Sequence, residues 1–264
     1  MAYADDTLLM GVSPDHLTEF LNAVDISGHR FGFSLHSDKF QLVQVNSSSP
    51  VYLPSGLAIP AKATLGYLGT TLADDGRINS ELARRIGMAK ADYQSLAKIW
   101  RHSALGRKWK LSIYHSLVES KLLYGLASVC LNVSARRRLD GFQNKCLRDI
   151  LGIRPSFYSR VSNASVLQRA SVKAASMQLE TTHLQLLGKV IRATPANPLR
   201  SSCLVGNTLQ PLTSHYIRRV GRPRKEWVTT VPPQALQQAG GSENTLTQLV
   251  QDPAAWKRLV KARA

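Results

Sequence analysis

The chain has 264 residues and is strongly basic, with 34 Lys and Arg side chains against 17 Asp and Glu. Its hydrophobic content of 44% argues against a wholly disordered protein, and because no apolar run reaches about 18 residues, no membrane-spanning helix is expected. The cysteines, Cys130, Cys146 and Cys203, are widely spaced, which excludes a disulfide framework and a zinc knuckle. The N-terminal residues lack the layout of a secretion signal, so we expect the protein in the nucleus or the cytoplasm.

The charge is distributed unevenly along the chain. Residues 1–60 carry 2 basic and 6 acidic side chains, whereas residues 61–264 carry 32 basic and 11 acidic ones. This reversal predicts a body that binds a polyanion, attached to an acidic region that can bind metal ions.

The acidic region begins with Tyr3-Ala4-Asp5-Asp6, followed by apolar residues. An Asp-Asp step between such residues predicts the turn of a β-hairpin. Two carboxylates at a turn, in a protein this basic, favour Mg²⁺, which takes one or two carboxylates together with substrate phosphates. The alternative is an acidic turn that only faces water.

Residues 13–62 predict one helix and several short strands. Ser13 is the expected N-cap of a helix from Pro14 to about Asp25. Its apolar face should pack on the underside of a sheet and consists of Leu17, Phe20, Leu21 and Val24. A turn leading into a strand is predicted at residues 31–35, and strands are predicted at 40–45 and 51–53.

A β-hairpin is predicted at residues 65–72. Gly66 and Gly69 would let its backbone approach a nucleic-acid strand closely, although a plain hairpin is compatible with the same residues. Asp74-Asp75-Gly76 is predicted to be a turn, not a second metal site.

Helical periodicity then predicts a three-helix bundle at residues 78–103, 106–126 and 134–151, with a helix stop at Gly152. Residues 101–154 hold 11 basic and 3 acidic side chains, which is too lopsided for salt-bridge patterning. Sequence-independent contact with phosphates explains this better than solvated charge does. The side chains predicted to lie outside the bundle for this purpose are Arg84, Arg85, Lys90, Arg107, Lys108, Lys110, Arg136, Arg137 and Arg138.

The sequence after Gly152 predicts less regular structure. Helices are expected at 164–171 and 174–192, a loose linker at 194–216, and beyond Pro232-Pro233 a tail with one short helix near 254–262. Between linker and tail lies a basic segment whose candidate contacts are Arg219, Arg222, Arg224 and Lys225. Phosphate contact, readout of an A·T-rich minor groove and nuclear import are all open for it.

Several of these motifs together resemble a reverse transcriptase of a non-LTR (LINE-type) retrotransposon, from the end of the palm through the thumb. The resemblance is carried by the Tyr3–Asp6 tetrad, by Tyr67-Leu68-Gly69, and by two patterns in the helical part. These patterns are Leu122-Leu123-Tyr124-Gly125 and Ile150-Leu151-Gly152-Ile153, with Arg137-Arg138-Leu139 between them. The resemblance covers roughly residues 1–230.

The resemblance implies RNA-templated DNA synthesis with two Mg²⁺ ions, an RNA template, a DNA primer or target, and a dNTP. It implies that Asp5 and Asp6 are metal-binding residues, that Tyr3 supports primer or nucleotide placement, and that Lys39 lies near the phosphates. Lys39 is alternatively a plain surface lysine. Tyr67, Leu68 and Gly69 would belong to the hairpin that holds the primer.

The expected fold is α+β: a partial palm at 1–77, a helical thumb at 78–153, a helical extension at 154–193, and a linker with a basic tail at 194–264. In the family, the fingers and a third metal-binding aspartate precede the tetrad, so we expect an N-terminal polymerase half to be missing and this fragment to be inactive alone. The alternative is a non-enzymatic, basic nucleic-acid-binding fragment or a relic of such an element.

Overall fold

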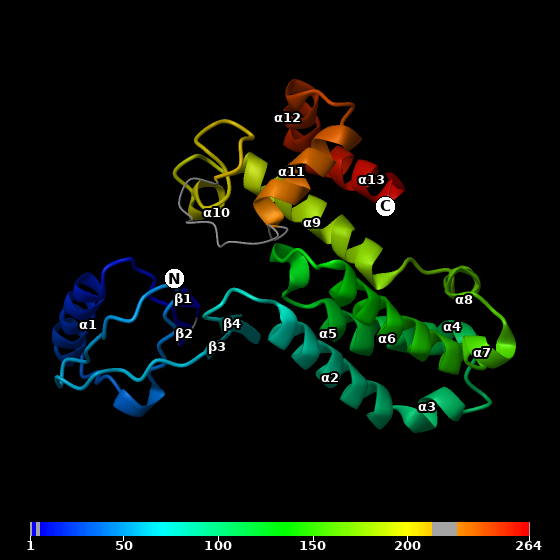
Figure 1. Cartoon of the computed structure of the whole chain (residues 1–264), viewed down its shortest axis with the longest axis horizontal. Coiled ribbons are helices and arrows are strands. Elements are labelled where there is room, and N and C mark those ends of the chain that lie inside the picture. The colour runs from blue at the N-terminus through cyan, green and yellow to red at the C-terminus, as the bar shows by residue number, and fades with distance from the viewer. Residues whose placement is uncertain (1, 4–5, 213–225, 264) are drawn as a thin grey trace. The chain divides into compact units, whose positions relative to one another are not determined.

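The structure is a computed structural model that describes residues 2–3, 6–212 and 226–263 (Figure 1). The described part is mostly helical, with two-stranded antiparallel sheets, so the α+β class is confirmed. The chain divides into two compact units, Met1–Glu81 and Leu82–Ala264. No helix of the described residues is long and apolar enough to cross a membrane.

The first unit begins with a hairpin and a helix. Strands β1 (Ala2–Tyr3) and β2 (Asp6–Thr7) pair antiparallel, with Tyr3 opposite Asp6. Helix α1 (Pro14–His29) begins as expected, because the Ser13 hydroxyl accepts a hydrogen bond from the His16 amide at 3.3 Å. It ends four residues later than the sequence predicted.

The strand predicted at 51–53 is reduced to an isolated bridge between Tyr52 and Ala58. Of the turn and strand predicted at residues 31–35 only the turn is present, and the strand predicted at 40–45 is wrong. A turn and a short 3₁₀ helix, η1 (Ser37–Lys39), occupy this region, and Leu42 makes only an isolated bridge to Ala61. Leu42 and Phe40 pack against a small core of Leu21, Val51, Leu53 and Ile59, so their apolar character serves this core and not a sheet.

Helix α1 therefore packs on residues 51–59 and not on the underside of a sheet. This segment is a tight turn in which the Leu53 amide donates to the Leu57 carbonyl and the Ile59 amide to the Val51 carbonyl, both at 2.9 Å. The turn is too small to cover the whole apolar face of α1, since Phe20 and Val24 remain 51% and 38% exposed.

The hairpin predicted at residues 65–72 is confirmed by β3 (Thr64–Tyr67) and β4 (Thr70–Ala73). Its two turn residues, Leu68 and Gly69, have φ angles of +46° and +71°, the left-handed pair that suits a two-residue hairpin turn. The turn at Asp74–Gly76 is also confirmed: the Asp75 carboxylate accepts from the Arg77 amide at 2.7 Å, and Gly76 has a φ of +61°.

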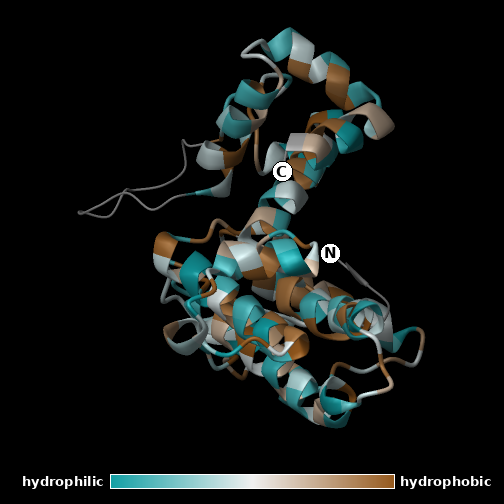
Figure 2. Cartoon of the chain, turned by 90° about the vertical axis from the view of Figure 1, so that its right-hand side faces the viewer, coloured by the Kyte–Doolittle hydropathy of each residue, from teal (hydrophilic) through white to brown (hydrophobic). Residues whose placement is uncertain are grey.

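The second unit is helical, and the helix that leads into it begins three residues before the unit boundary. Its helices are α2 (Asn79–Ser95), α3 (Ala97–Arg101), α4 (Arg107–Ile113), a π-helical turn η2 (Tyr114–Glu119), α5 (Ser120–Leu123), the 3₁₀ turn η3 (Leu126–Ser128), α6 (Val133–Leu151), α7 (Ser156–Ser159), α8 (Asn163–Ala170), α9 (Ala175–Arg192), α10 (Pro198–Ser201), α11 (Trp227–Gln238), α12 (Glu243–Gln251) and α13 (Pro253–Arg263). Figure 2 shows hydrophobic and hydrophilic residues interleaved along the longer helices, as amphipathic packing requires.

The predicted bundle is present in outline. The third helix is confirmed as α6: the Asn132 side chain caps it by accepting from the Ala135 amide at 2.8 Å, and Gly152 ends it at a φ of +67°. The first two predicted helices are each interrupted, the first between α2 and α3 and the second by the π-helical turn.

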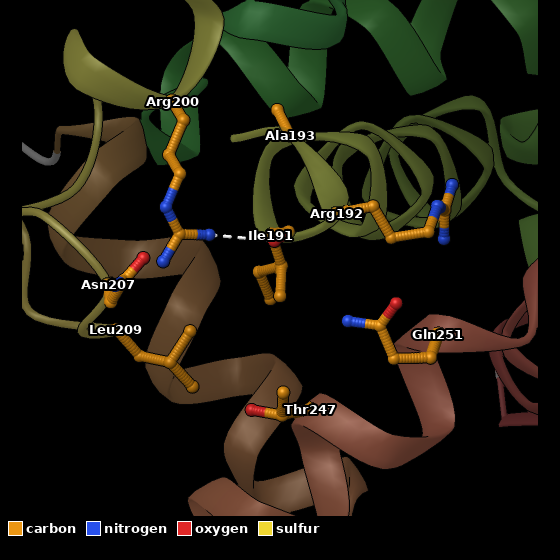
Figure 3. A pocket seen from close by; sticks show the side chains of 8 residues that line it. All are labelled: Ile191, Arg192, Ala193, Arg200, Asn207, Leu209, Thr247 and Gln251. Atoms are coloured by element: carbon orange, nitrogen blue, oxygen red, sulfur yellow. Dashed lines mark hydrogen bonds between the residues drawn. The ribbon is translucent and has the colours of Figure 1, made fainter. Parts of the chain in front are cut away.

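Among the described residues of the predicted loose linker, 194–212, the chain forms the short helix α10 and a loop with specific hydrogen bonds. Arg200 on α10 is 5% exposed, and its guanidinium donates to the carbonyls of Ile191 at 2.7 Å, Gly206 at 2.8 Å and Thr208 at 3.2 Å. Figure 3 shows this arginine at the wall of a pocket of about 330 Å³. One buried side chain thus links the end of α9 to the following loop. The polar, proline-containing sequence of this region does not indicate such a link.

The segment beyond Pro232-Pro233 also has more regular structure than the predicted tail with one short helix. Both prolines lie inside α11, and α11, α12 and α13 pack on α9 around a shared core that includes Leu187, Val231 and Trp256. The expected short helix near 254–262 corresponds to α13.

Candidate nucleic-acid interface

The acidic hairpin is only partly described. Asp5 and the side chain of Tyr3 lie outside the described residues, so their predicted roles stay predictions. Asp6 lies on β2 opposite Tyr3, not in the turn where we predicted the Asp-Asp step. Its carboxylate is exposed, and a hard oxygen donor of this kind fits one ligand of a Mg²⁺ ion. Among the described residues there is no group of three or more His, Cys, Asp or Glu side chains that could hold a metal ion.

The other predicted site residues of the first unit lie on turns. Lys39 ends η1 and is exposed. Tyr67 is half-buried at the end of β3, and Leu68 and Gly69 form the exposed hairpin tip. Within the described part of the chain, no hydrogen bond or ion pair joins Lys39 to Asp6.

In the second unit, residues 82–174 carry 18 basic and 4 acidic side chains. Three of the four carboxylates are engaged: Asp92 pairs with Lys121 at 2.6 Å, Asp140 accepts from the Ser176 amide and hydroxyl at 2.9 and 2.7 Å, and Glu119 is 6% exposed. Few carboxylates are therefore left to neutralise the exposed cations. We call these cations the cationic surface: Lys90, Lys98, Arg101, Arg107, Lys108, Arg137, Arg138, Lys145, Arg154, Arg160 and Arg169.

Some predicted phosphate contacts are instead structural. Arg85 is 3% exposed and lies over the Tyr124 ring at 4.6 Å, so its predicted place outside the bundle is wrong. The reason is helical spacing, which puts it on the same face as the buried Leu82 and Ala89. The position of Arg85 within the apolar stripe of the helix is the feature of the sequence that indicates its burial.

Three further predicted contacts are only half-exposed. Arg136 pairs with Glu180, Lys110 donates to the Trp100 carbonyl at 2.8 Å, and Arg84 contacts the Met88 sulfur at 3.2 Å. Lys90, Arg107, Lys108, Arg137 and Arg138 are exposed as predicted. The candidates Arg219, Arg222, Arg224 and Lys225 lie outside the described residues.

A buried polar network of the second unit lies at the π-helical turn η2. The Glu119 carboxylate accepts from Gln143 and Gln178 at 3.0 Å each and contacts the His115 ring nitrogen at 2.5 Å. Gln143, which is fully buried, also donates to the Lys173 carbonyl and accepts from the Ala175 amide, so it ties α6 to the start of α9. These contacts satisfy Glu119 inside the unit and remove it from the electrostatics of the surface.

The His115–Glu119 contact should make stability depend on pH. The hydrogen bond to Glu119 raises the pKa of His115 above its ordinary value, against the opposing effect of burial. The folded chain therefore holds a proton that the unfolded chain has lost just above pH 6.5, so this stabilisation is present below that pH and disappears as pH rises through the folded pKa. The free energy of unfolding, measured from pH 6 to 9, should decline more in the parent chain than in a His115→Gln variant.

His183 is the internal control for that comparison. Burial lowers its pKa, so its contribution is lost as pH falls, opposite in direction to that of His115. Because His183 is present in both proteins, parallel stability curves for parent and variant would contradict the assignment to His115.

The exposed aromatic side chains of this unit were not predicted as functional. Trp109 is 68% exposed between Lys108 and Lys110, and Phe157 and Tyr158 are 73% and 71% exposed between Arg154 and Arg160. Aromatic residues flanked by arginines in a segment without carboxylates were the signal that could have found them.

Comparisons with models of protein families, with curated proteins and with solved structures returned no match for this chain. The resemblance to reverse transcriptases therefore rests on the motifs of the sequence. The arrangement of charge in the helical unit is an independent observation that bears on function.

Proposed function

We propose that the chain binds nucleic acid without sequence preference through the cationic surface, as the thumb of a non-LTR reverse transcriptase. The observation that supports this most directly is the excess of basic side chains in residues 82–174, where three of the four carboxylates are engaged or buried. Exposed lysines and arginines in such excess suit a partner with a regular array of negative charges. Phosphates of RNA and DNA provide that array.

The proposed parent reaction is DNA synthesis on an RNA template, in which the acidic hairpin belongs to the catalytic centre. Asp5 and Asp6 would hold Mg²⁺, which when bound activates the primer hydroxyl and neutralises the dNTP phosphates. Lys39 would place a positive charge near the leaving pyrophosphate, and Tyr3 would support the primer or nucleotide. The exposed turn of Leu68 and Gly69 would let the hairpin backbone approach the primer strand.

Binding of this kind should be strongly salt-dependent, which gives the test. If three phosphates of a DNA duplex are neutralised, affinity should fall roughly 40-fold between 50 and 200 mM salt, because condensed counterions are released. Fluorescence anisotropy with labelled duplexes of two unrelated sequences measures both the salt slope and the sequence preference. Similar affinities for both sequences are expected.

Neighbouring arginines offer a matched control. An Arg137→Gln/Arg138→Gln variant removes two exposed charges and should reduce the slope of log affinity against log salt by about 1.8. Arg136→Gln, at the adjacent position, removes a charge already paired with Glu180 and should change the slope less. Affinity that is insensitive to salt, or equal slopes for all variants, would contradict the proposal.

A further inference from the structure

The loop between α6 and α8 exposes two adjacent aromatic rings. Phe157 and Tyr158 lie on the short helix α7, 73% and 71% exposed, with their ring centroids 5.3 Å apart at an interplanar angle of 85°. The Arg160 guanidinium lies 5.7 Å from the centroid of the Phe157 ring. Adjacent exposed aromatic rings of this kind commonly mark a binding site. We call Phe157, Tyr158 and Arg160 the aromatic platform.

A buried arginine holds both ends of this loop in place. Arg148 on α6 is 7% exposed, and its guanidinium donates to the Arg154 carbonyl at 3.2 Å before the platform. It also donates to the Val161 carbonyl at 2.8 Å and the Asn163 side chain at 2.9 Å after the platform. The exposed rings are therefore presented on a fixed backbone, which lowers the entropy lost when a ligand binds.

The backbone within the loop reinforces this arrangement. The amides of Tyr158 and Ser159 both donate to the Pro155 carbonyl at 3.0 Å, and the Arg160 amide donates to the Ser156 carbonyl at 3.0 Å. Arg160 has a φ of +54°, a left-handed backbone conformation that residues other than glycine rarely adopt. This local strain ends α7 at the residue whose guanidinium faces the Phe157 ring, and strain of this kind concentrates at functional sites.

The charge around the platform selects the kind of ligand. Residues 150–179 contain no Asp or Glu, and Arg154, Arg160 and Arg169 in this stretch are exposed. A ligand that matches both features must offer flat, unstacked rings and negative charge at short intervals. Single-stranded nucleic acid has both, whereas the bases of a duplex are already stacked on one another.

We propose that the aromatic platform stacks bases of a single-stranded segment of RNA or DNA, while Arg154 and Arg160 contact its phosphates. This inference rests on the proposed function and adds to it a preference for single strands, located at one loop. Phosphate contact alone would favour a duplex, which has the higher charge density, whereas exposed rings favour a single strand with unstacked bases.

The test compares the intact 264-residue chain with a Phe157→Ala/Tyr158→Ala variant. Three fluorescent probes are used at constant salt: a 12-nucleotide single-stranded RNA, a 12-base-pair duplex, and a 12-unit abasic strand that carries phosphates without bases. The variant should lose roughly tenfold in affinity for the single strand for each base that stacks. It should bind the duplex and the abasic strand within about twofold of the parent chain, and its salt slope should be unchanged.

A matched control removes the same amount of exposed aromatic surface elsewhere. Phe31 and Phe33 in the first unit are 78% and 72% exposed, and Phe31→Ala/Phe33→Ala should leave all three affinities unchanged. Circular dichroism of each variant, compared with the parent chain, establishes that the fold is retained.

The outcomes separate the platform from the proposed function. If the parent chain binds the duplex with the expected salt slope, but the platform variant binds the single strand equally well, the platform is overturned and the proposed function stands. If the parent chain binds no probe, both are overturned. Equal losses on single strand, duplex and abasic strand would show that the rings act through the fold, and competition by poly-glutamate that depends on Phe157 and Tyr158 would assign the platform to an acidic polypeptide instead.

Discussion

Under the proposed function, replacing Asp5 by asparagine is expected to abolish primer extension by the full-length polymerase. Asparagine has the shape of aspartate but lacks its charge, so it is a poor ligand for a hard divalent cation. Two-metal nucleotidyl transfer depends on carboxylates that hold both ions against the attacking and leaving oxygens. Loss of one ligand should lower the rate by about 10³ or more, which corresponds to roughly 4 kcal/mol of transition-state stabilisation.

The chain contains a matched control for this experiment, because Asp-Asp occurs twice. Asp74-Asp75 belongs to the turn after β4, where Asp75 accepts from the Arg77 amide and pairs with its side chain at 3.2 Å. Asp74→Asn has the same chemistry as Asp5→Asn and should leave primer extension within a fewfold of the parent enzyme. Persistent activity of Asp5→Asn would contradict the reverse transcriptase assignment and favour the non-enzymatic alternative.

The elements that could be predicted from the sequence are those with local signals at both ends. Helix α6 has an asparagine cap and a glycine stop, and the β3–β4 hairpin has a glycine that accepts a left-handed turn. Such signals act over three to five residues, so they remain valid in whatever tertiary context the segment folds. The three-helix outline of residues 78–153 follows from the same kind of local information.

The elements that could not be predicted depend on distant partners. Phe40 and Leu42 have the apolarity of a strand, but they pack on the core of Leu21 and Ile59, and among the described residues Leu42 pairs only through an isolated bridge to Ala61. The sequences of helices α11 and α12 contain few helix signals, and α11 contains two prolines, which argue against a helix. They are stabilised by burial against α9, and a local sequence pattern does not indicate which helix a C-terminal segment will pack against.

Residues of the candidate site also fall into those that local signals predict and those that depend on distant partners. Exposed cations such as Arg137 and Arg138 were identified from charge excess alone, because exposure is the default for a charged side chain. The burial of Arg85 and Arg148 does not follow from charge, because each is buried by a specific partner. Arg85 lies over the Tyr124 ring, and Arg148 donates to the loop that contains α7. The sequence alone can indicate the rings of the aromatic platform, from the flanking arginines and the lack of carboxylates, but only the buried Arg148 shows that their loop is held in place.

Replacing Trp256 by alanine is expected to destabilise the helical unit by about 3–5 kcal/mol, the largest stability effect of any single substitution considered. The side chain is 2% exposed within the core shared by α9, α11, α12 and α13, and its indole nitrogen donates to the Leu184 carbonyl at 2.9 Å. Alanine would leave a cavity and remove the hydrogen bond from the indole to the Leu184 carbonyl. Urea unfolding followed by circular dichroism measures the change.

Two comparisons show whether packing of this indole is the cause. Trp109→Ala removes the same side chain from a 68% exposed position and should change stability by no more than about 0.5 kcal/mol. Gly188 lies directly beneath the indole, since a Cβ there would meet the Trp256 nitrogen at 2.5 Å and Cδ1 at 2.6 Å. Gly188→Ala should therefore destabilise by about 1–3 kcal/mol through overpacking.

Gly141→Ala on α6, where a Cβ would meet nothing within 4 Å, should instead stabilise by up to about 1 kcal/mol through helix propensity alone. Opposite signs for these two glycines would show that α9 is shaped to receive α13, so that residues 226–263 are part of the fold of the helical unit. Equal effects at the two glycines, or at the two tryptophans, would contradict that packing. The cationic surface and the aromatic platform would then have to be assigned to a smaller folded unit that ends before α11.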